Sequence, residues 1–242
     1  MTTPTRQMPL PLGFAPARSF ANFLTGDNRA AFEALRQLAP ASTPVYLWGP
    51  AGSGKTHLLE ALALAWQARG EAVGWFSPAT PAPWPHDEAR SLVVLDDCDR
   101  YDDARQHEAF SLFVDAATQG QTVVAAGALP PVDLALRDDL RSRLGWGLVY
   151  ALAPLAEVET RAALKREAAR RGIALPDEVI DYLLVRSARD LTHLMTLLDR
   201  LDAFALAAQR AVTVPLLRQM LEEGVKESVK ESVEESASPG AG

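Results

Sequence analysis

The stretch Gly49-Pro-Ala-Gly-Ser-Gly54-Lys55-Thr56 decides the fold of this chain of 242 residues. It has the spacing G-x-x-x-x-G-K-[ST], and it lies between the apolar run VYLWG (45–49) and a helical pattern over 54–69. Glycines let backbone N–H groups face phosphate oxygens, and the positive end of the following helix adds to the attraction. Strand, glycine-rich loop and helix together predict a nucleotide-binding loop.

We predict that Lys55 reaches the β- and γ-phosphates and that the Thr56 hydroxyl ligates Mg²⁺. His57 follows directly and either covers phosphate or lies on the helix surface. The predicted cofactor-binding residues of this loop are Gly49, Pro50, Ala51, Gly52, Ser53, Gly54, Lys55, Thr56 and His57.

Paired acids end a second apolar run, SLVVLDD (91–97). The carboxyl ends of parallel strands are where open α/β sheets bind ligands. We expect Asp96 to hold Mg²⁺, directly or through water, and Asp97 to orient or polarise an attacking water. The alternative is that both acids cap a turn at the end of the strand.

Strand and helix patterns alternate around these motifs. Short apolar runs over 45–49, 72–76, 91–97, 122–127 and 148–152 read as strands, with helices over 54–69, about 103–118 and 133–143, and a first helix beginning near Asp27. Runs without polar alternation are typical of parallel strands that are covered on both faces. We predict an α/β P-loop fold with a five-stranded parallel sheet flanked by helices.

The pattern changes after Pro154, where only helices follow, over 157–171, 176–186, 188–209 and 214–222. We predict an extended arm over 1–19, a nucleotide-binding domain over 20–153, a small all-α lid over 154–222 and an acidic, disordered tail over 223–242. The tail repeats VKES, and its like charges four residues apart weaken it as a helix.

Composition limits the function classes. The formal net charge is −7, whereas a dedicated duplex-DNA binder shows a basic stripe. The chain has neither a signal-peptide core nor an apolar run of about 18 residues, so we expect no membrane segment and a cytoplasmic location. The one cysteine, Cys98, excludes an intramolecular disulfide, and the four scattered histidines offer no metal cluster.

Two arginines lie where a nucleotide could meet them. Arg143, in Arg-Ser-Arg143-Leu-Gly-Trp-Gly, precedes the last strand, and Arg189 begins a helix of the lid. A guanidinium can touch a γ-phosphate within its own chain or reach a neighbour's nucleotide as an arginine finger. An arginine near a helix end is otherwise ordinary surface charge.

Together these motifs resemble the nucleotide-binding AAA+ domain of the bacterial replication initiator DnaA, over about residues 19–220. The stretch 141–161 is similar to that family's box VII, while Phe110 and Phe113 match a helix after the paired acids. The segment with Phe20, Phe23, Gly26 and Asn28 is similar to the one that packs near adenine, which implies that Asn28 contributes to nucleotide binding. The resemblance further implies that Arg143 is an arginine finger acting in trans and that Arg189 is a second-sensor residue facing the chain's own ADP or ATP.

A second resemblance lies in the arm. Gln7-Met8-Pro9-Leu10-Pro11-Leu12 is similar to peptides that bind the bacterial sliding clamp, in which Gln fixes the register and the leucines fill an apolar pocket. The predicted clamp-binding residues are Gln7, Met8, Leu10, Pro11 and Leu12. Pro9 removes one backbone donor from this peptide.

We expect neither the initiator's helix-turn-helix domain nor its assembly domain. A clamp peptide before a single initiator-type ATPase domain is the layout of regulatory homologues that inactivate the initiator. The resemblance implies binding to the β sliding clamp of DNA polymerase III on DNA, stimulated hydrolysis of DnaA-bound ATP to ADP, and prevention of re-initiation. The resemblance implies that the chain contacts DNA only indirectly, through the clamp. A homo-oligomer of the chain is compatible with these motifs.

Two other functions stay open: a helicase-loader-type AAA+ ATPase, and a DNA-binding initiator fragment. The loader needs a competent first sensor, but Ala128 stands where the family commonly has Asp. We therefore expect nucleotide binding with weak turnover of the chain's own ATP. We also expect Trp146 to be a core residue.

Overall fold

The computed structural model describes residues 17–186 and 191–223. The chain divides into two compact units, one of Pro16–Ala156 and the other containing the helices from Glu157 onward. The first unit carries the phosphate loop and the paired acids, so it is described first.

Five parallel strands form the sheet of the first unit, in the order β2-β3-β4-β1-β5. The strands are β1 (Val45–Trp48), β2 (Ala72–Phe76), β3 (Arg90–Leu95), β4 (Thr122–Gly127) and β5 (Leu148–Ala151). Strand β1 pairs with both β4 and β5, and Val45 lies opposite Val124 on one side and Leu148 on the other. The predicted five-stranded parallel sheet is confirmed.

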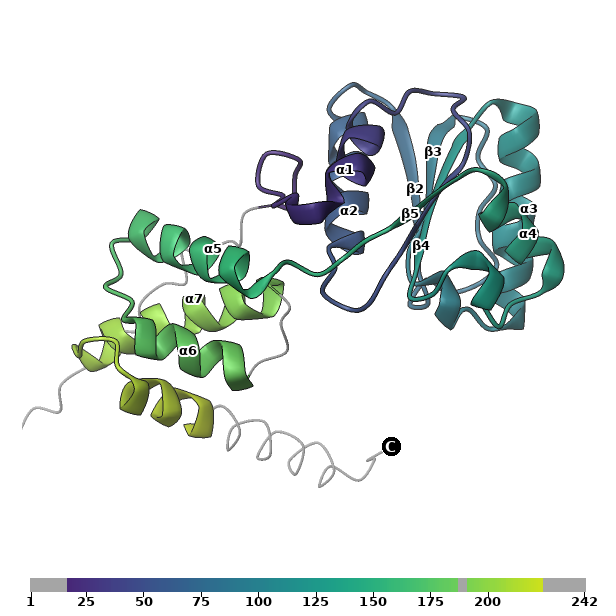
Figure 1. Ribbon diagram of the computed structural model, residues 1–242. Coiled ribbons are helices and arrows are strands. Elements are labelled where there is room, and N and C mark those ends of the chain that lie inside the picture. Colours follow the sequence, from purple (N-terminus) through teal and green to yellow (C-terminus); the bar gives the residue numbers. More distant parts are fainter. Residues whose placement is uncertain (1–16, 187–190, 224–242) are drawn as a thin grey trace, which may run out of the picture. The chain divides into compact units, whose positions relative to one another are not determined.

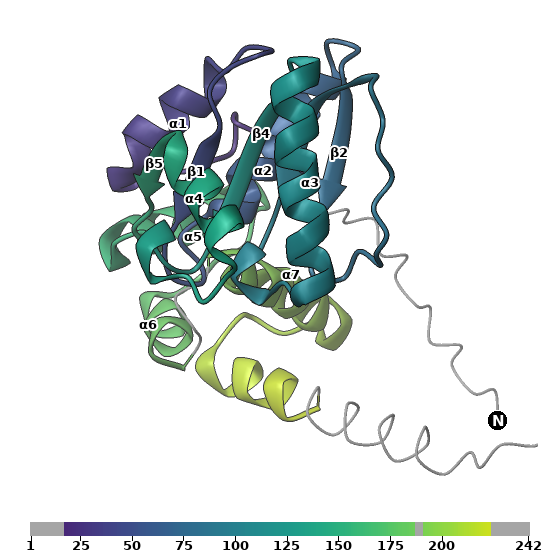
Figure 2. The ribbon, with the colours of Figure 1, turned by 90° about the vertical axis from the view of Figure 1, so that its right-hand side faces the viewer.

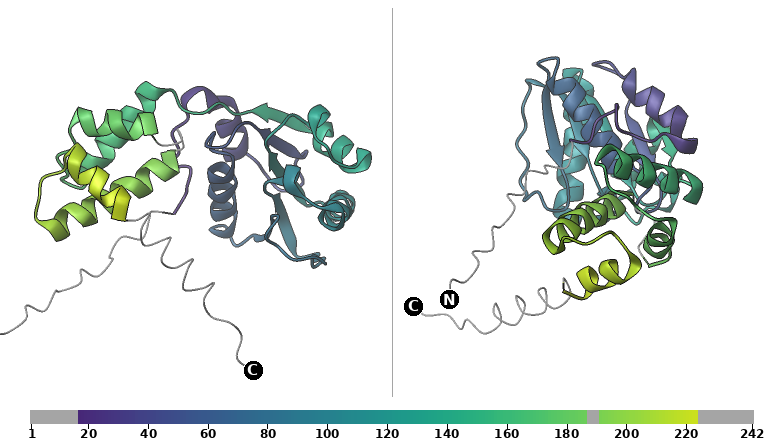
Figure 3. Two further views of the ribbon diagram at one scale, coloured as in Figure 1. Left: turned by 90° about the horizontal axis from the view of Figure 1, so that it is seen from below. Right: turned by 90° about the vertical axis from the view of Figure 1, so that its left-hand side faces the viewer.

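Helices cover both faces of this sheet. The 3₁₀ turn η1 (Gly26–Asn28), α1 (Arg29–Arg36) and α2 (Lys55–Gln67) lie on one face, and α3 (Asp103–Gln119) and α4 (Asp138–Trp146) lie on the other (Figure 1). The view from below shows the sheet between these two layers (Figure 3, left), and α3 runs across the outer face in Figure 2. Two short 3₁₀ turns, η2 (Cys98–Arg100) and η3 (Pro131–Asp133), follow β3 and β4.

Strand alternation divides the core into two parts. Val45 and Leu47 point into the layer of α1 and α2, whereas Tyr46 between them points into the layer of α3 and α4. Strands buried on both faces can be apolar at every position, which explains the unbroken apolar runs of the sequence.

Helix α4 differs from its prediction. We expected a helix over 133–143, but α4 begins at Asp138. Leu134 is extended, and it and Leu136 are both buried, with the two-residue spacing of an extended chain. The backbone N–H of Arg137 then donates to Gln106 Oε1 on α3 (2.9 Å). Burial of two leucines thus holds the chain extended until the acidic first turn of α4.

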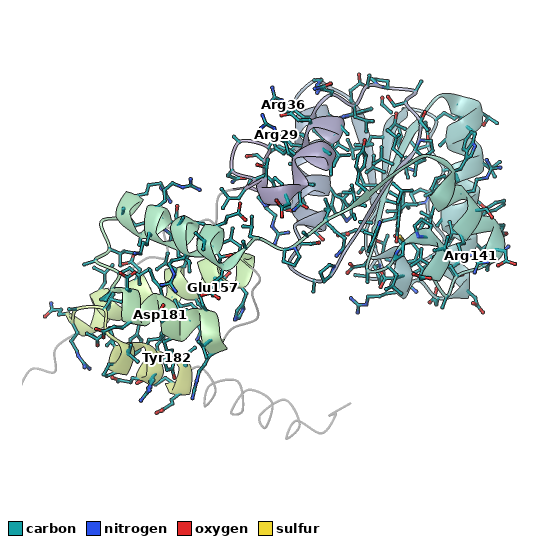
Figure 4. All side chains as sticks on the ribbon, viewed as in Figure 1. Arg29, Arg36, Arg141, Glu157, Asp181 and Tyr182 are labelled. Carbon is teal, nitrogen blue, oxygen red and sulfur yellow. The ribbon has the colours of Figure 1, made fainter. Side chains whose placement is uncertain are left out.

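The second unit is entirely helical where it is described. It contains α5 (Glu157–Arg170), α6 (Asp177–Arg186), α7 (Leu191–Ala208) and a further helix over 214–223. Its core includes Leu164, Ile180, Leu198 and Leu216. On its surface, Arg161 pairs with Asp181 (2.5 Å) on the neighbouring helix, where Figure 4 labels Asp181. In neither described stretch, 17–186 or 191–223, is there a helix that is both long and apolar enough to span a membrane.

Candidate functional site

The phosphate loop has the backbone that its glycines predict. Gly52 and Gly54 have φ angles of 77° and 95°, a region that residues with a Cβ avoid. A Cβ on Gly49 would lie 2.2 Å from the carbonyl oxygen of Leu152, so only glycine fits between β1 and the chain after β5. Lys55 Nζ donates to the carbonyl oxygens of Gly49 (2.7 Å) and Pro50 (3.0 Å). The ammonium group is therefore held inside the loop.

Ser53 gives an independent indication that this loop receives a ligand. Its hydroxyl is buried, and it has no hydrogen-bond partner among the described residues. An unpaired buried hydroxyl costs about 1–3 kcal/mol, which a ligand oxygen would offset. Backbone glycines, an inward ammonium and a free hydroxyl fit a phosphate group.

The predicted metal-binding residues meet at the start of α2. Thr56 Oγ1 donates to Asp96 Oδ2 (2.9 Å), and the other carboxylate oxygen of Asp96 accepts from the N–H of Asp97 (3.0 Å). Burial raises the pKa of Asp96, the nearby Asp97 raises it further, and the Thr56 bond opposes the rise. Hydroxyl and carboxylate oxygens beside a phosphate loop are the ligands that Mg²⁺ prefers. These residues fit the ion.

Asp97 faces a solvent-accessible pocket beside the loop. The pocket has a volume of about 740 Å³ and is lined by Thr56, Glu60, Trp75, Ser77, Pro78, Ala79, Asp96, Asp97 and Arg100. Asp97 has a left-handed backbone (φ 49°), and its carboxylate lies 3.5 Å from Arg100. This placement does not test the prediction that Asp97 orients or polarises a water, which stays a prediction. Arg100 is a pocket residue that the sequence had not singled out.

The segment before α1 packs directly on the phosphate loop. A Cβ on Gly54 would lie 2.8 Å from Cε2 of Phe23, so the ring covers this glycine. His57 Nε2 lies 3.1 Å from both the carbonyl oxygen of Ser19 and Oδ1 of Asn22, and burial lowers the pKa of the imidazole. His57 thus joins α2 to this segment instead of lying free on the helix surface. A contact between His57 and phosphate stays a prediction.

Asn28 has a structural role that the sequence did not reveal. Its side-chain amide donates to the carbonyl oxygen of Ala153 and accepts from the N–H of Ala153, both at 2.8 Å. It therefore ties the start of α1 to the chain after β5. Its contribution to nucleotide binding stays a prediction, and any such contact needs the remaining amide hydrogen or lone pair.

At the end of β4, Ala128 brings no polar side chain to the first-sensor position. Its N–H donates to Asp99 Oδ1 (2.9 Å), a contact that the sequence did not predict. The nearby Cys98 is fully buried, and its thiol donates to the carbonyl oxygen of Ala126.

Arg143 differs from the other arginines of its region. Arg137 pairs with Asp139 (2.6 Å), and Arg141 pairs with Asp138 (2.5 Å) on the outer side of α4 (Figure 4). Arg143 is half-buried and has no ion-pair partner within 17–186 and 191–223. The core prediction for Trp146 is wrong, because its side chain is 69% exposed at the end of α4. The helix turns its leucines inward and thereby presents Trp146 to solvent.

The remaining predicted site residues lie outside the described part of the chain. They are Arg189 and the clamp-binding residues Gln7, Met8, Leu10, Pro11 and Leu12.

Two family models match the chain. The model of the bacterial DnaA ATPase domain matches residues 15–73, which include the phosphate loop, and the model described as Hda, lid domain, matches residues 157–221.

Solved structures agree with these matches. A crystal structure of a DNA replication initiation factor has 25% identity and a TM-score of 0.62, over 76% of this chain and 64% of that one. AMPPCP-bound DnaA from Aquifex aeolicus has 26% identity and a TM-score of 0.61, over 76% and 65%. Domain III of Thermotoga maritima DnaA, at 20% identity, shows the fold alone, with a TM-score of 0.69 over 87% of this chain and 98% of the domain. The chain spans less than two thirds of the first two proteins.

Proposed function

Since the chain is a Hda/DnaA-like AAA+ protein, we propose that it is a regulatory inactivator of the replication initiator DnaA. It binds the DNA-loaded sliding clamp and stimulates hydrolysis of the ATP held by DnaA. The initiator left with ADP then does not start a second round of replication. Such a factor acts in the cytoplasm, at the replication machinery.

The unpaired guanidinium of Arg143 is the observation that carries this proposal. Its two arginine neighbours are neutralised by aspartates, whereas Arg143 has no such partner in the described part of the chain. A half-buried cation without a counterion is suited to an anion brought by another molecule, such as the γ-phosphate of a partner's ATP. Arg143 would then stabilise the charge that develops on that phosphate during hydrolysis.

The chain's own nucleotide would be ADP or ATP. Lys55, Ser53 and the backbone of the glycine loop would hold its phosphates, while Thr56 and Asp96 would hold Mg²⁺. Bound Mg²⁺ supplies neutralisation of phosphate charge. Ala128 cannot orient a water through its side chain, so we expect slow turnover at this site. Arg189 would face the same nucleotide.

The arm supplies the second partner of the proposal. Gln7, Leu10 and Leu12 would fix and fill the clamp's peptide pocket, and the prolines would limit the entropy lost on binding. Changing these three residues to Ala should abolish clamp binding without changing nucleotide affinity. Unchanged clamp affinity would contradict the arm's assignment.

The decisive measurement is the rate at which ATP bound to the cognate DnaA becomes ADP, with DNA-loaded clamp present. Adding this protein should accelerate hydrolysis, and Arg143→Ala should return the rate to its unstimulated value, since arginine fingers contribute about 10³–10⁵ in rate where measured. Arg141→Ala is the matched control, because it removes a paired arginine two residues away on the same helix. Equal loss in both variants would refute the specific role of Arg143.

A loader-type or remodelling AAA+ ATPase is the alternative, favoured by the complete Lys55, Thr56 and Asp96 set. Rapid ATP turnover by this chain alone, without effect on DnaA-bound ATP, would support the alternative.

A further inference from the structure

The end of β4 lies between the two parts of the phosphate and Mg²⁺ site. Strand β4 is flanked by β3 and β1 in the sheet. Asp96 follows β3 and the phosphate loop follows β1, so the residues after β4 separate the predicted Mg²⁺ ligand from the loop. The N–H of Gly49 donates to the carbonyl oxygen of Gly127 (3.4 Å), which joins the loop directly to the last residue of β4. A polar group at this point would face the γ-phosphate of a bound ATP.

Two small residues at the end of β4 make room for a carboxylate from the neighbouring strand. A Cβ on Gly127 would lie 3.0 Å from Asp99 Oδ1 and 2.3 Å from Tyr46 Oη, so a side chain there would displace one of them. The next residue, Ala128, donates its N–H to Asp99 Oδ1 (2.9 Å). A backbone nitrogen is about 1.5 Å from its own Cα, so Oδ1 lies at most about 4.4 Å from the Cα of Ala128. Asp99 therefore brings a carboxylate to the place where the DnaA family commonly has one at position 128.

The turn after β3 fixes Asp99 in this place. Asp97 has a left-handed backbone (φ 49°), and the chain then forms η2, which carries Asp99. Within η2, the Cys98 thiol donates to the carbonyl oxygen of Ala126 on β4 (2.8 Å). Contacts from two successive residues thus hold η2 against the end of β4. A group held in this way reaches its target with little loss of conformational entropy.

One oxygen of this carboxylate is free. Asp99 is half-buried, and its Oδ2 has no hydrogen-bond or ion-pair partner within 17–186 and 191–223. A carboxylate accepts hydrogen bonds at both oxygens, and a partly buried anion without a cation is stabilised by such donors. A water molecule beside a γ-phosphate is a donor of this kind.

We propose that Asp99 takes the place of the missing first-sensor side chain in this chain's own ATP site. Its Oδ2 accepts a hydrogen bond from the water that attacks the γ-phosphate, while the water's other hydrogen is available to Asp97. The water oxygen forms a bond to the γ-phosphorus, and the bond from that phosphorus to the bridging oxygen breaks and leaves its electron pair on ADP. One water hydrogen stays on the phosphate formed, and the other is released to solvent as a proton. Turnover stays slow, because the other oxygen of Asp99 is already engaged by the N–H of Ala128.

The competing interpretation is that Asp99 only supports the backbone after β4. Asp99→Asn distinguishes the two roles, since the amide oxygen of Asn still accepts from the N–H of Ala128. The amide nitrogen replaces Oδ2 and cannot accept a hydrogen bond from water. This variant therefore keeps the support and removes the proposed chemistry.

The test is single-turnover hydrolysis of ATP bound to an excess of this protein, with ATP and ADP affinities measured beside it. Asp99→Asn should lower the rate about tenfold or more, because orientation of the water is lost. Its nucleotide affinities should stay within about twofold of the wild type, since the contact acts on the reaction and not on binding. Asp103→Asn is the matched control, because it removes an exposed acid four residues away at the start of α3 and should behave as the wild type. Lys55→Ala gives the background rate.

A second variant tests whether the two positions are equivalent. Adding Ala128→Asp to Asp99→Asn returns a carboxylate to the end of β4 and should raise the rate severalfold above that of Asp99→Asn alone. No recovery would overturn the equivalence of the two carboxylates. A rate equal in Asp99→Asn and the wild type, or a wild-type rate no higher than that of Lys55→Ala, would overturn the role of Asp99. Equal losses of rate and of nucleotide affinity would assign Asp99 to backbone support and overturn it as well.

The inference rests on the nucleotide binding of the proposed function, and the measurements separate the two. A wild-type protein that binds no ATP would refute the nucleotide site itself. Normal ATP affinity with a rate independent of Asp99 would overturn only the role of Asp99. Stimulation of hydrolysis of DnaA-bound ATP, which the proposed function assigns to Arg143, should be unchanged in Asp99→Asn.

Discussion

Replacing Gly54 by Ala tests the contact between the phosphate loop and the segment before α1. Gly54 has a φ of 95°, and a Cβ there would lie 2.8 Å from Cε2 of Phe23. The left-handed backbone costs a residue with a Cβ about 1–2 kcal/mol. Overpacking against the ring adds about 1–3 kcal/mol. We therefore expect Gly54→Ala to lower the free energy of unfolding by about 2–5 kcal/mol.

Gly70→Ala is the matched control for this substitution. Gly70 also has a positive φ, 84°, but a Cβ there would meet nothing within 4 Å. Only the backbone cost of about 1–2 kcal/mol should remain. The difference between the two variants isolates the clash with Phe23.

Urea unfolding followed by tryptophan fluorescence is a suitable assay, because all five tryptophans lie in the unit Pro16–Ala156. Phe23→Ala should recover the steric part of the loss in a double-mutant cycle with Gly54→Ala. If Gly54 and Gly70 variants lost equal stability, or the cycle gave no coupling, the proposed packing of Phe23 on the loop would be refuted. ADP affinity should fall at least tenfold in Gly54→Ala alone, because the Cβ displaces the loop where its N–H groups meet phosphate.

Three further outcomes are expected. Asp96→Asn should stabilise the protein at neutral pH, because burial raises the pKa of this carboxyl and the stability of the folded protein is therefore lost as pH rises through that pKa. The same substitution should abolish the gain in ADP affinity that Mg²⁺ gives. Urea unfolding with and without Mg-ADP measures both effects. Asn28→Ala should cost about 1–3 kcal/mol in the same assay, because it removes two hydrogen bonds to Ala153, and a smaller effect would mean that solvent replaces them. Burial lowers the pKa of His57, so the folded protein favours the neutral imidazole, and this stabilisation should be lost as pH falls below about 6.5. The urea midpoint should therefore fall less between pH 7.5 and 5.5 in His57→Gln than in the wild type.

The sheet and the phosphate loop could be predicted because their signals are local. Short apolar runs mark the strands, and the loop's glycines specify a backbone that the structure shows at Gly52 and Gly54. The start of α4 was predicted five residues too early because Leu136 continues the four-residue apolar spacing of Leu140 and Leu144, although it lies in the extended chain before the helix.

The tertiary contacts of the site could not be predicted in this way. Asn28 and Ala153 are 125 residues apart, and Asp99 meets the N–H of Ala128 only because β3 and β4 are neighbours. The exposure of Trp146 could not be predicted either, because an apolar residue at a helix end gives the same sequence pattern whether its side chain is buried or exposed.

The unit Pro16–Ala156 has every group expected of a phosphate and Mg²⁺ site but lacks a polar side chain at the first-sensor position. Lys55, Thr56 and Asp96 are arranged to hold a nucleotide, yet the residue after β4 has a methyl group, and its N–H is already bonded to Asp99. Binding therefore has its full set of groups, whereas orientation of an attacking water lacks one. Arg143, in contrast to its neighbours Arg137 and Arg141, has no ion-pair partner among the described residues. This combination supports the proposal that the chain acts on a partner's ATP rather than on its own.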